Sequence, residues 1–402
     1  MTNDQIIQHS QALAPSLGRI QYLALVVGLL GIVGAVVGYS SHPDQFFQSY
    51  LLSYVYWMGL TMGSLGVLMM HHLAGGRWGF SIRRLLEAGT RTLPVMIILF
   101  IPVIVGLHTL YEWTHLDVVK ADPILSKKQG YLNESSFLWR QVFYFALWGV
   151  MAFLLNRWSS QQDTTVETHP TRRMQRLSGI GILVYALSMT LAAVDWIMSL
   201  EPHWFSTIFS AIYILGQMLL TWAFVVIVGA PLSQSAPLNA LLTNERLRDL
   251  GTFMLAFVML WTYTSFSQLL ITWGANLPEE ISWYLTRLKG SWLTVGYLII
   301  GFHFLLPFVL LVSSRIKARI PILVTIALGL MLMRLVDLYW ITAPAFDKSG
   351  IDIHWLDVAL PVGMGGIWVS VFFWHLKRRS LVALNDPRFD YPSGDGDDRT
   401  HG

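Results

Sequence analysis

The sequence predicts an all-α integral membrane protein with ten transmembrane helices. Of its 402 residues, 54% are hydrophobic and only 13% are charged, whereas a soluble domain carries roughly a quarter of charged residues. Ten apolar runs approach the roughly 20 residues that a helix needs to cross the hydrocarbon core of a bilayer. Transmembrane β-strands would be about half as long and would alternate apolar with polar residues. The runs lie near residues 20–38, 50–70, 94–110, 137–155, 179–199, 208–229, 250–272, 291–313, 320–341 and 355–376.

The lack of cysteine limits the redox chemistry that this chain performs by itself. With no cysteine, the chain cannot hold a cysteine-ligated iron–sulfur cluster, a thioether-attached haem or a disulfide. A b-type haem needs facing histidines on opposed helices, and His108 and His303 lie at different depths without matching partners. The sequence also shows no metal-ligand cluster, phosphate-binding loop or nucleophile motif. We therefore expect no covalently bound cofactor and no metal ligands in this chain.

The distribution of arginine and lysine predicts how the chain is oriented. Loops that follow even-numbered helices are richer in these residues than loops that follow odd-numbered helices. The positive-inside rule then places the even loops and both termini in the cytoplasm. The cationic residues on the cytoplasmic side are Arg77, Arg83, Arg84, Arg91, Arg157, Arg172, Arg173, Arg176, Arg246, Arg248, Arg315, Lys317, Arg319, Lys377, Arg378 and Arg379.

The two ends of the chain are expected to differ in structure. The first apolar run follows Arg19, has full spanning length and shows no small-residue cleavage site, so it is predicted to be a retained helix. The tail 385–402 is rich in Asp, Gly and Pro and is predicted to be disordered. Small residues in the first helix allow close contact with another helix, although a Gly-rich span without a particular partner is the alternative. These are Gly28, Gly31, Gly34 and Gly38.

Ionisable and amide side chains gather at one predicted depth, toward the outer ends of helices 3, 4, 5, 7 and 9. This coincidence suggests an internal polar chamber that faces outward. The alternative is a set of interfacial side chains that extend to water, which suits Glu112 and Arg140 at helix edges better than Arg334 and Asp337. The latter two are three residues apart on one helix face, and we predict that they form a buried ion pair. The full set is His108, Glu112, Arg140, Asp195, Gln268, Arg334 and Asp337.

Asp195 is the most informative residue of this set. A carboxylate at membrane depth costs about 2.5–3.5 kcal/mol on insertion scales and is usually retained for a function. We interpret Asp195 as a group that exchanges protons with the outer side; a structural role in bracing neighbouring helices is the alternative. His303 and Gln217 lie near the middle of their helices and are candidates for a proton route farther inward. Hydrogen-bonded packing is the equally weighted alternative for both.

Several segments carry a resemblance to a known family. The chain resembles the polysulfide-reductase/nitrite-reductase (NrfD-type) membrane subunits, and more closely the ten-helix ActF-type subunit of the bacterial alternative complex III. The Asp195 and Asn276 segments are specific, whereas the Gly-rich and apolar parts are not. The segments span helices 2–9, about three quarters of the chain, and are Gly75-Gly76-Arg77-Trp78-Gly79 with Arg83-Arg84 and Glu87, Tyr131-Leu132-Asn133 through Arg140, Asp195 through Phe209, Phe266-Ser267-Gln268, Asn276-Leu277-Pro278-Glu279-Glu280 with Arg287, and Arg334 through Trp340.

The resemblance implies a fold of two four-helix bundles, with helices 1 and 10 outside them. Residues 1–49 would contain peripheral helix 1, and 50–207 and 208–354 would form the two bundles. Residues 355–384 would contain helix 10, followed by the cytoplasmic tail 385–402. The sequence carries a faint echo of a repeat, because Asp195-Trp196 and Asp337 through Trp340 end the two bundles alike.

The resemblance also implies a function for the whole assembly. Such complexes reside in the bacterial inner membrane, oxidise quinol (menaquinol or ubiquinol) at the outer side and pass electrons to iron–sulfur and c-type haem subunits. The expected partners are those subunits, a paralogous quinol-binding membrane subunit and membrane lipids, with no nucleic acid. This chain would supply scaffold and a proton path. A direct quinol site in helices 2–5 and a secondary transporter with a midplane site are the alternatives.

Overall fold

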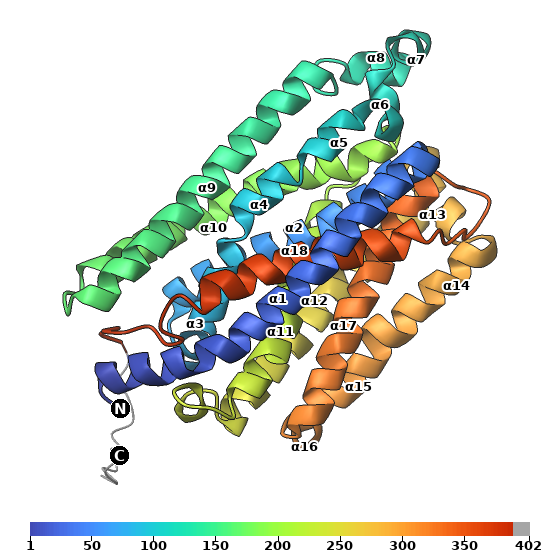
Figure 1. Cartoon of the computed structure of the whole chain (residues 1–402). Coiled ribbons are helices and arrows are strands. Elements are labelled where there is room, and N and C mark those ends of the chain that lie inside the picture. Colours follow the sequence, from blue (N-terminus) through green and yellow to red (C-terminus); the bar gives the residue numbers. More distant parts are fainter. Residues whose placement is uncertain (389–402) are drawn as a thin grey trace.

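The protein is an all-α membrane protein, as its composition predicts. A computed structural model describes residues 1–388; the protein is 82% helical, and no strand occurs in this range. Within residues 1–388, ten helices are long and apolar enough to cross a membrane. Successive spans run up and down (Figure 1), and the two ends of the described chain lie at the same end of the molecule, where Asn3 donates a hydrogen bond to Asn385 (2.9 Å). We call this end the termini face and the opposite end the loop face.

The first bundle consists of the second to fifth spans. The third span is broken into short pieces because Pro94 and Pro102 begin new helical turns and cannot donate to the preceding one. Asn133 caps the next helix by accepting a hydrogen bond from the amide of Ser136 (2.8 Å). The elements are α2 (Pro43–Ala74), α3 (Arg77–Thr90), α4 (Leu93–Ile98), α5 (Ile101–Val105), α6 (Leu107–Leu110), η1 (Glu112–Thr114), α7 (Leu116–Ala121), α8 (Pro123–Lys128), α9 (Glu134–Thr164), α10 (His169–Trp196) and η2 (Met198–Leu200).

The second bundle consists of the sixth to ninth spans. Thr243 caps α12 at the termini face, and Asn276 ends it in the left-handed conformation with φ 49°. The eighth span changes from α to π geometry near its middle. The elements are α11 (Phe209–Leu232), η3 (Leu238–Ala240), α12 (Asn244–Ala275), α13 (Pro278–Arg287), α14 (Gly290–Leu298), the π-helical segment η4 (Ile299–Leu305), α15 (Leu306–Val312), α16 (Ser314–Lys317), α17 (Ile320–Thr342) and η5 (Ala343–Ala345).

The first and last spans pair with each other outside the bundles. α1 (Asn3–Ser41) and α18 (Leu356–Leu376) cross in front of α2 in Figure 1. A Cβ atom on Gly31 would lie 2.1 Å from the Cα of Gly363, so glycine at both positions permits this backbone contact. The close contact that the glycines of the first helix allow is therefore made with α18.

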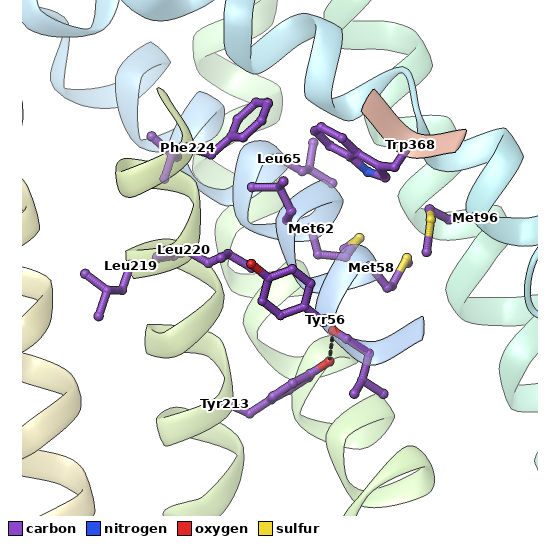
Figure 2. Packing of buried hydrophobic residues seen from close by; sticks show 14 of the residues in the cluster. Tyr56, Met58, Met62, Leu65, Met96, Tyr213, Leu219, Leu220, Phe224 and Trp368 are labelled. Atoms are coloured by element: carbon purple, nitrogen blue, oxygen red, sulfur yellow. Dashed lines mark hydrogen bonds between the residues drawn. The ribbon is translucent and has the colours of Figure 1, made fainter. Parts of the chain in front are cut away.

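The two bundles meet through α2 and α11, the most deeply buried of the ten spans. Figure 2 shows apolar side chains from both helices interleaved, with Met62 and Leu65 of α2 facing Leu220 and Phe224 of α11. Tyr213 of α11 reaches toward α2 at the lower edge of this core. The bundle interface is therefore close-packed, and polar groups enter it at a few positions.

Two expectations about the termini face need revision. The third span begins at Arg77 rather than near residue 94, and Arg83 and Arg84 lie in α3. They are buried, not loop residues exposed to solvent, because carboxylates surround them. The tail from residue 385 was predicted to be disordered, but residues 385–388 pack against the bundle, where Asn385 and Arg388 donate hydrogen bonds to backbone carbonyls. The rest of the tail, 389–402, lies outside the described residues.

Candidate functional site

Asp195 lies at the loop-face end of α10, fully buried and paired with Arg140 of α9. Arg140 donates from Nε to Oδ2 and from Nη2 to Oδ1, each at 2.9 Å. Such a bidentate fork is the strongest guanidinium–carboxylate geometry. Tyr144 donates its hydroxyl to Oδ2 at 3.0 Å, and the Gln141 amide reaches the same oxygen at 3.3 Å. Every one of these contacts stabilises the ionised carboxylate.

Arg140 connects this buried carboxylate to the loop face. Its Nη1 donates to the carbonyl of Tyr131 (2.9 Å) and to the hydroxyl of Ser136 (2.6 Å). The guanidinium carbon lies 3.8 Å from the centre of the Tyr131 ring, and the Arg140 side chain is 15% exposed. Burial and the charge of Asp195 raise the pKa of Tyr131 to about 12. Arg140 therefore has other acceptors and some solvent contact besides its carboxylate partner.

The second charged pair lies in α17 of the second bundle. Arg334 donates from Nη1 to Asp337 Oδ2, and the two side chains are 1% and 4% exposed. The prediction of a buried pair is confirmed. A Cβ atom on Gly216 would lie 2.3 Å from the guanidinium carbon, so glycine at this position lets Arg334 lie against α11. The carbonyl of Tyr213, at 3.5 Å, is only a long second acceptor.

Buried tyrosines lie beside Trp196 and deeper in the bundle interface. The ring of Tyr54 packs edge-on against Trp196, which follows Asp195 in the chain (5.8 Å between centroids). Tyr54 is fully buried, and its hydroxyl has no hydrogen-bond partner within residues 1–388. Tyr185 donates its hydroxyl to Gln217 Oε1 at 3.2 Å, deeper in the bundle interface. Buried polar atoms without a protein partner are where ordered water binds, and the Tyr54 hydroxyl is one such atom in this interface.

His303 and Gln268 are both buried in the second bundle, and neither side chain is hydrogen-bonded to the Arg334–Asp337 pair. The His303 ring lies in η4 and packs against Trp261 of α12, with centroids 4.3 Å apart. Both ring nitrogens of His303 and both amide atoms of Gln268 lack a partner within the described range. π-Helical segments occur frequently at functional sites. Both side chains face the interior rather than lipid, since both residues are buried.

His108 and Glu112 do not join either pair. Both are exposed at the loop face, where His108 Nε2 lies 3.4 Å from Glu134 Oε1. The third span ends at Val105, so both residues lie beyond its loop-face end. His108 and Glu112 are thus separate from the two buried charged pairs, Arg140–Asp195 in the first bundle and Arg334–Asp337 in the second.

The ends of the two bundles are closed by similar arginines. Arg287, at the end of α13, donates to Glu201 Oε2 and to the carbonyl of Ile341, both at 2.7 Å. Its guanidinium carbon lies 3.7 Å from the centre of the Trp283 ring. Burial lowers the pKa of Arg287 although the charge of Glu201 opposes this. Arg287 thus resembles Arg140 in stacking on an aromatic ring and donating to backbone carbonyls, but its carboxylate partner is Glu201 and not the aspartate of α17.

The termini face holds a buried ionic network that was not predicted as part of the site. Glu87 accepts hydrogen bonds from Arg83 Nε (2.8 Å) and from Arg84 Nη1 (2.6 Å). His71 and His72 lie beside it, buried, with no side-chain hydrogen-bond partner among residues 1–388. The remaining members are Asp163, Arg379, Asp386 and Arg388, together with Ser159 and Ser160.

Several site residues were missed from sequence although a signal was present. Gln141 and Tyr144 follow Arg140 at helical spacing, which places all three on adjacent parts of one helix face. Arg83, Arg84 and Glu87 show the same i, i+3 and i+4 spacing. Both sets were hidden because an arginine near a helix end is more simply interpreted as an interfacial residue.

The chemistry available to these groups is proton exchange and polar binding. Carboxylates, imidazoles and tyrosine hydroxyls accept and donate protons, and they line both bundles and their interface. No cluster of three or more His, Cys, Asp or Glu side chains within residues 1–388 has a geometry for a metal ion. The chain matches no family model, and no curated protein matches it either.

Proposed function

We propose that this chain is a membrane subunit of a quinol:electron-acceptor oxidoreductase of the alternative complex III type, without a redox centre of its own. Its part is to form scaffold and to conduct protons between the loop face and the interior. The resemblance of its motifs to ActF-type subunits supports the assembly, and the lack of cysteine agrees with electron carriers on other chains. The loop face is then periplasmic and the termini face cytoplasmic.

The observation that carries the proton-conducting role is the Asp195 site. The Asp195 carboxylate is fully buried, and its partner Arg140, which is 15% exposed near a helix end, connects it to solvent. Ionisable residues inside membrane helices are characteristic of proton relays. Tyr144 donates its hydroxyl to the carboxylate, and Tyr54 packs against Trp196, the residue that follows Asp195.

Association with redox subunits is tested by extraction in mild detergent. The protein should migrate on a sizing column with c-type haem absorbance and iron–sulfur signals in constant ratio. If it elutes alone and colourless, as a transporter or a homo-oligomer would, the assignment to an oxidoreductase complex is wrong.

A direct quinol site on this chain is the second candidate, and one cavity favours it. A cavity of about 360 Å³ lies between α1, α2, α5 and α18, lined almost entirely by apolar side chains such as Phe47, Tyr50 and Met364. This volume lies at the lower end of typical ligand pockets. Photolabelling of the purified assembly with an azido-quinone distinguishes the candidates: label on these helices supports a quinol site here, and label confined to other subunits refutes it.

A further inference from the structure

We propose that the termini face carries a binding site for the phosphate of an acidic phospholipid, formed by Arg91, His375, Arg379 and Ser380. Arg91 lies at the end of α3 and the other three lie at or just beyond the end of α18. Together with Arg84 and Glu87 they surround a small cavity. The inference does not depend on the redox function proposed above.

The first argument is the balance of charge around the cavity. Five arginines, Arg83, Arg84, Arg91, Arg379 and Arg388, belong to or adjoin the ionic network, whose carboxylates are Glu87, Asp163 and Asp386. Within residues 1–388, five positive against three negative charges leave an excess of two. Arg83 and Arg84 are buried beside this excess, whereas Arg91 and Arg388 are partly exposed, and a phosphate anion at the cavity would offset it.

The second argument is that donors in the cavity lack acceptors. Arg84 is 4% exposed, yet its Nε has no hydrogen-bond partner within residues 1–388. Arg91 uses its Nε on the neutral Asn156 Oδ1 (2.6 Å), and none of the ion pairs in this network includes it. Burial together with the charges of Arg84 and Arg91 lowers the pKa of Arg379 to about 10, despite the opposing charge of Glu87. The charge of Glu87 thus does not outweigh the burial of Arg379 and the two neighbouring arginine charges.

The third argument is the position and size of the cavity. Its volume is only about 10 Å³, which is room for one oxygen atom rather than for a whole phosphate group. A phosphate must therefore lie at the mouth, with one oxygen directed inward. The mouth lies at the end of the last membrane span, α18, beside the junction of α3 with α4. Arg378, exposed and stacked on Trp374 (3.7 Å), adds a further cation beside it.

The test compares lipids in nanodiscs, using the protein with whatever subunits copurify. The wild type should gain several degrees in Tm when phosphatidylglycerol replaces part of the phosphatidylcholine, and should retain an acidic lipid in native mass spectrometry. Arg91→Gln, which keeps an amide for Asn156, should lose both effects. The control Arg157→Gln removes an exposed arginine of α9, toward the termini face. It should keep both the gain in Tm and the retained lipid.

Two further arms make the outcome decisive. Ser380→Asp places a carboxylate at the cavity, so it should be stable in phosphatidylcholine and gain nothing from phosphatidylglycerol, even if Arg91→Gln fails to fold. Inorganic phosphate added in detergent should not reproduce the lipid effect; if it does so fully, the site binds free phosphate instead and the lipid assignment is overturned. An equal gain from phosphatidylglycerol in wild type, Arg91→Gln and Ser380→Asp also overturns the proposal.

Discussion

Two arginine–aspartate pairs of different construction dominate the interior at the residue level. The Arg140–Asp195 pair joins two helices, and its arginine keeps the Tyr131 carbonyl, the Ser136 hydroxyl and some solvent contact. The pair in α17 lies within one helix and is almost completely buried, and the nearest further acceptor for Arg334, the carbonyl of Tyr213, lies at 3.5 Å. Loss of the carboxylate should therefore be tolerated at residue 195 and poorly tolerated at residue 337.

The α17 pair yields a prediction about assembly. Removing one partner strands a buried charge at a cost of about 3–5 kcal/mol. Arg334→Leu should therefore lower the amount of folded protein in the membrane more than the double change Arg334→Leu/Asp337→Leu does. Quantitative immunoblotting of membranes, normalised to a coexpressed control, measures this. Equal losses in both variants would show that the two charges are not coupled.

At the level of elements, the segment after α18, residues 377–388, packs across the first bundle; we call it the strap. Leu381 and Leu384 donate backbone hydrogen bonds to Ser10 (3.1 Å) and Asp163 (3.0 Å), and Asp386 pairs with Arg83 (3.0 Å). Burial raises the pKa of Asp386, but hydrogen bonds from Arg388 and the charge of Arg83 outweigh it and lower the pKa overall. A carboxylate with a lowered pKa stabilises the fold above its unfolded pKa and loses this contribution as acidification protonates it.

We predict that a cysteine buried within the strap is protected from labelling, and that it becomes reactive when the strap detaches. The chain has no native cysteine, so a single Val382→Cys provides a clean probe at a side chain that is 1% exposed. Maleimide should label it slowly in the otherwise native protein and at least tenfold faster when Asp386→Ala is added. Ser126→Cys, in α8 at the loop face, should react equally in both backgrounds. Equal protection of Val382→Cys in both would show that Asp386 does not hold the strap.

The elements could be predicted from sequence far better than the contacts between them. Ten apolar runs were sufficient for ten spans because backbone groups in lipid must be satisfied within each helix. The buried pair in α17 was also predictable, because Arg334 and Asp337 are three residues apart and therefore share one helix face. The partner of Asp195 was not, because Arg140 lies on another helix and helix-edge arginines ordinarily extend to water. The network at Glu87 was hidden likewise, as its members come from α3, α9 and the segment after α18.

At the level of the whole molecule, the bundles on either side of the α2–α11 interface each carry a buried aspartate, paired across helices in the first and within one helix in the second. Each bundle has an aspartate near the loop-face end of its last helix and an arginine that closes that end. The tyrosines of the interface lie between these sites and the histidines near Glu87. The central claim is that Asp195 passes protons between the loop face and this interior.

Asp195→Asn tests that claim most directly, because asparagine keeps the shape and hydrogen-bonding atoms but cannot ionise. Quinol-driven turnover and protons moved per electron are measured in the same membranes as the amount of assembled complex, with Asp117→Asn, an exposed carboxylate in α7, as the matched control. We expect Asp195→Asn to assemble at near-normal levels while turnover or proton yield falls at least tenfold, and Asp117→Asn to match the wild type. Unchanged turnover and proton yield in a fully assembled Asp195→Asn complex would contradict the account.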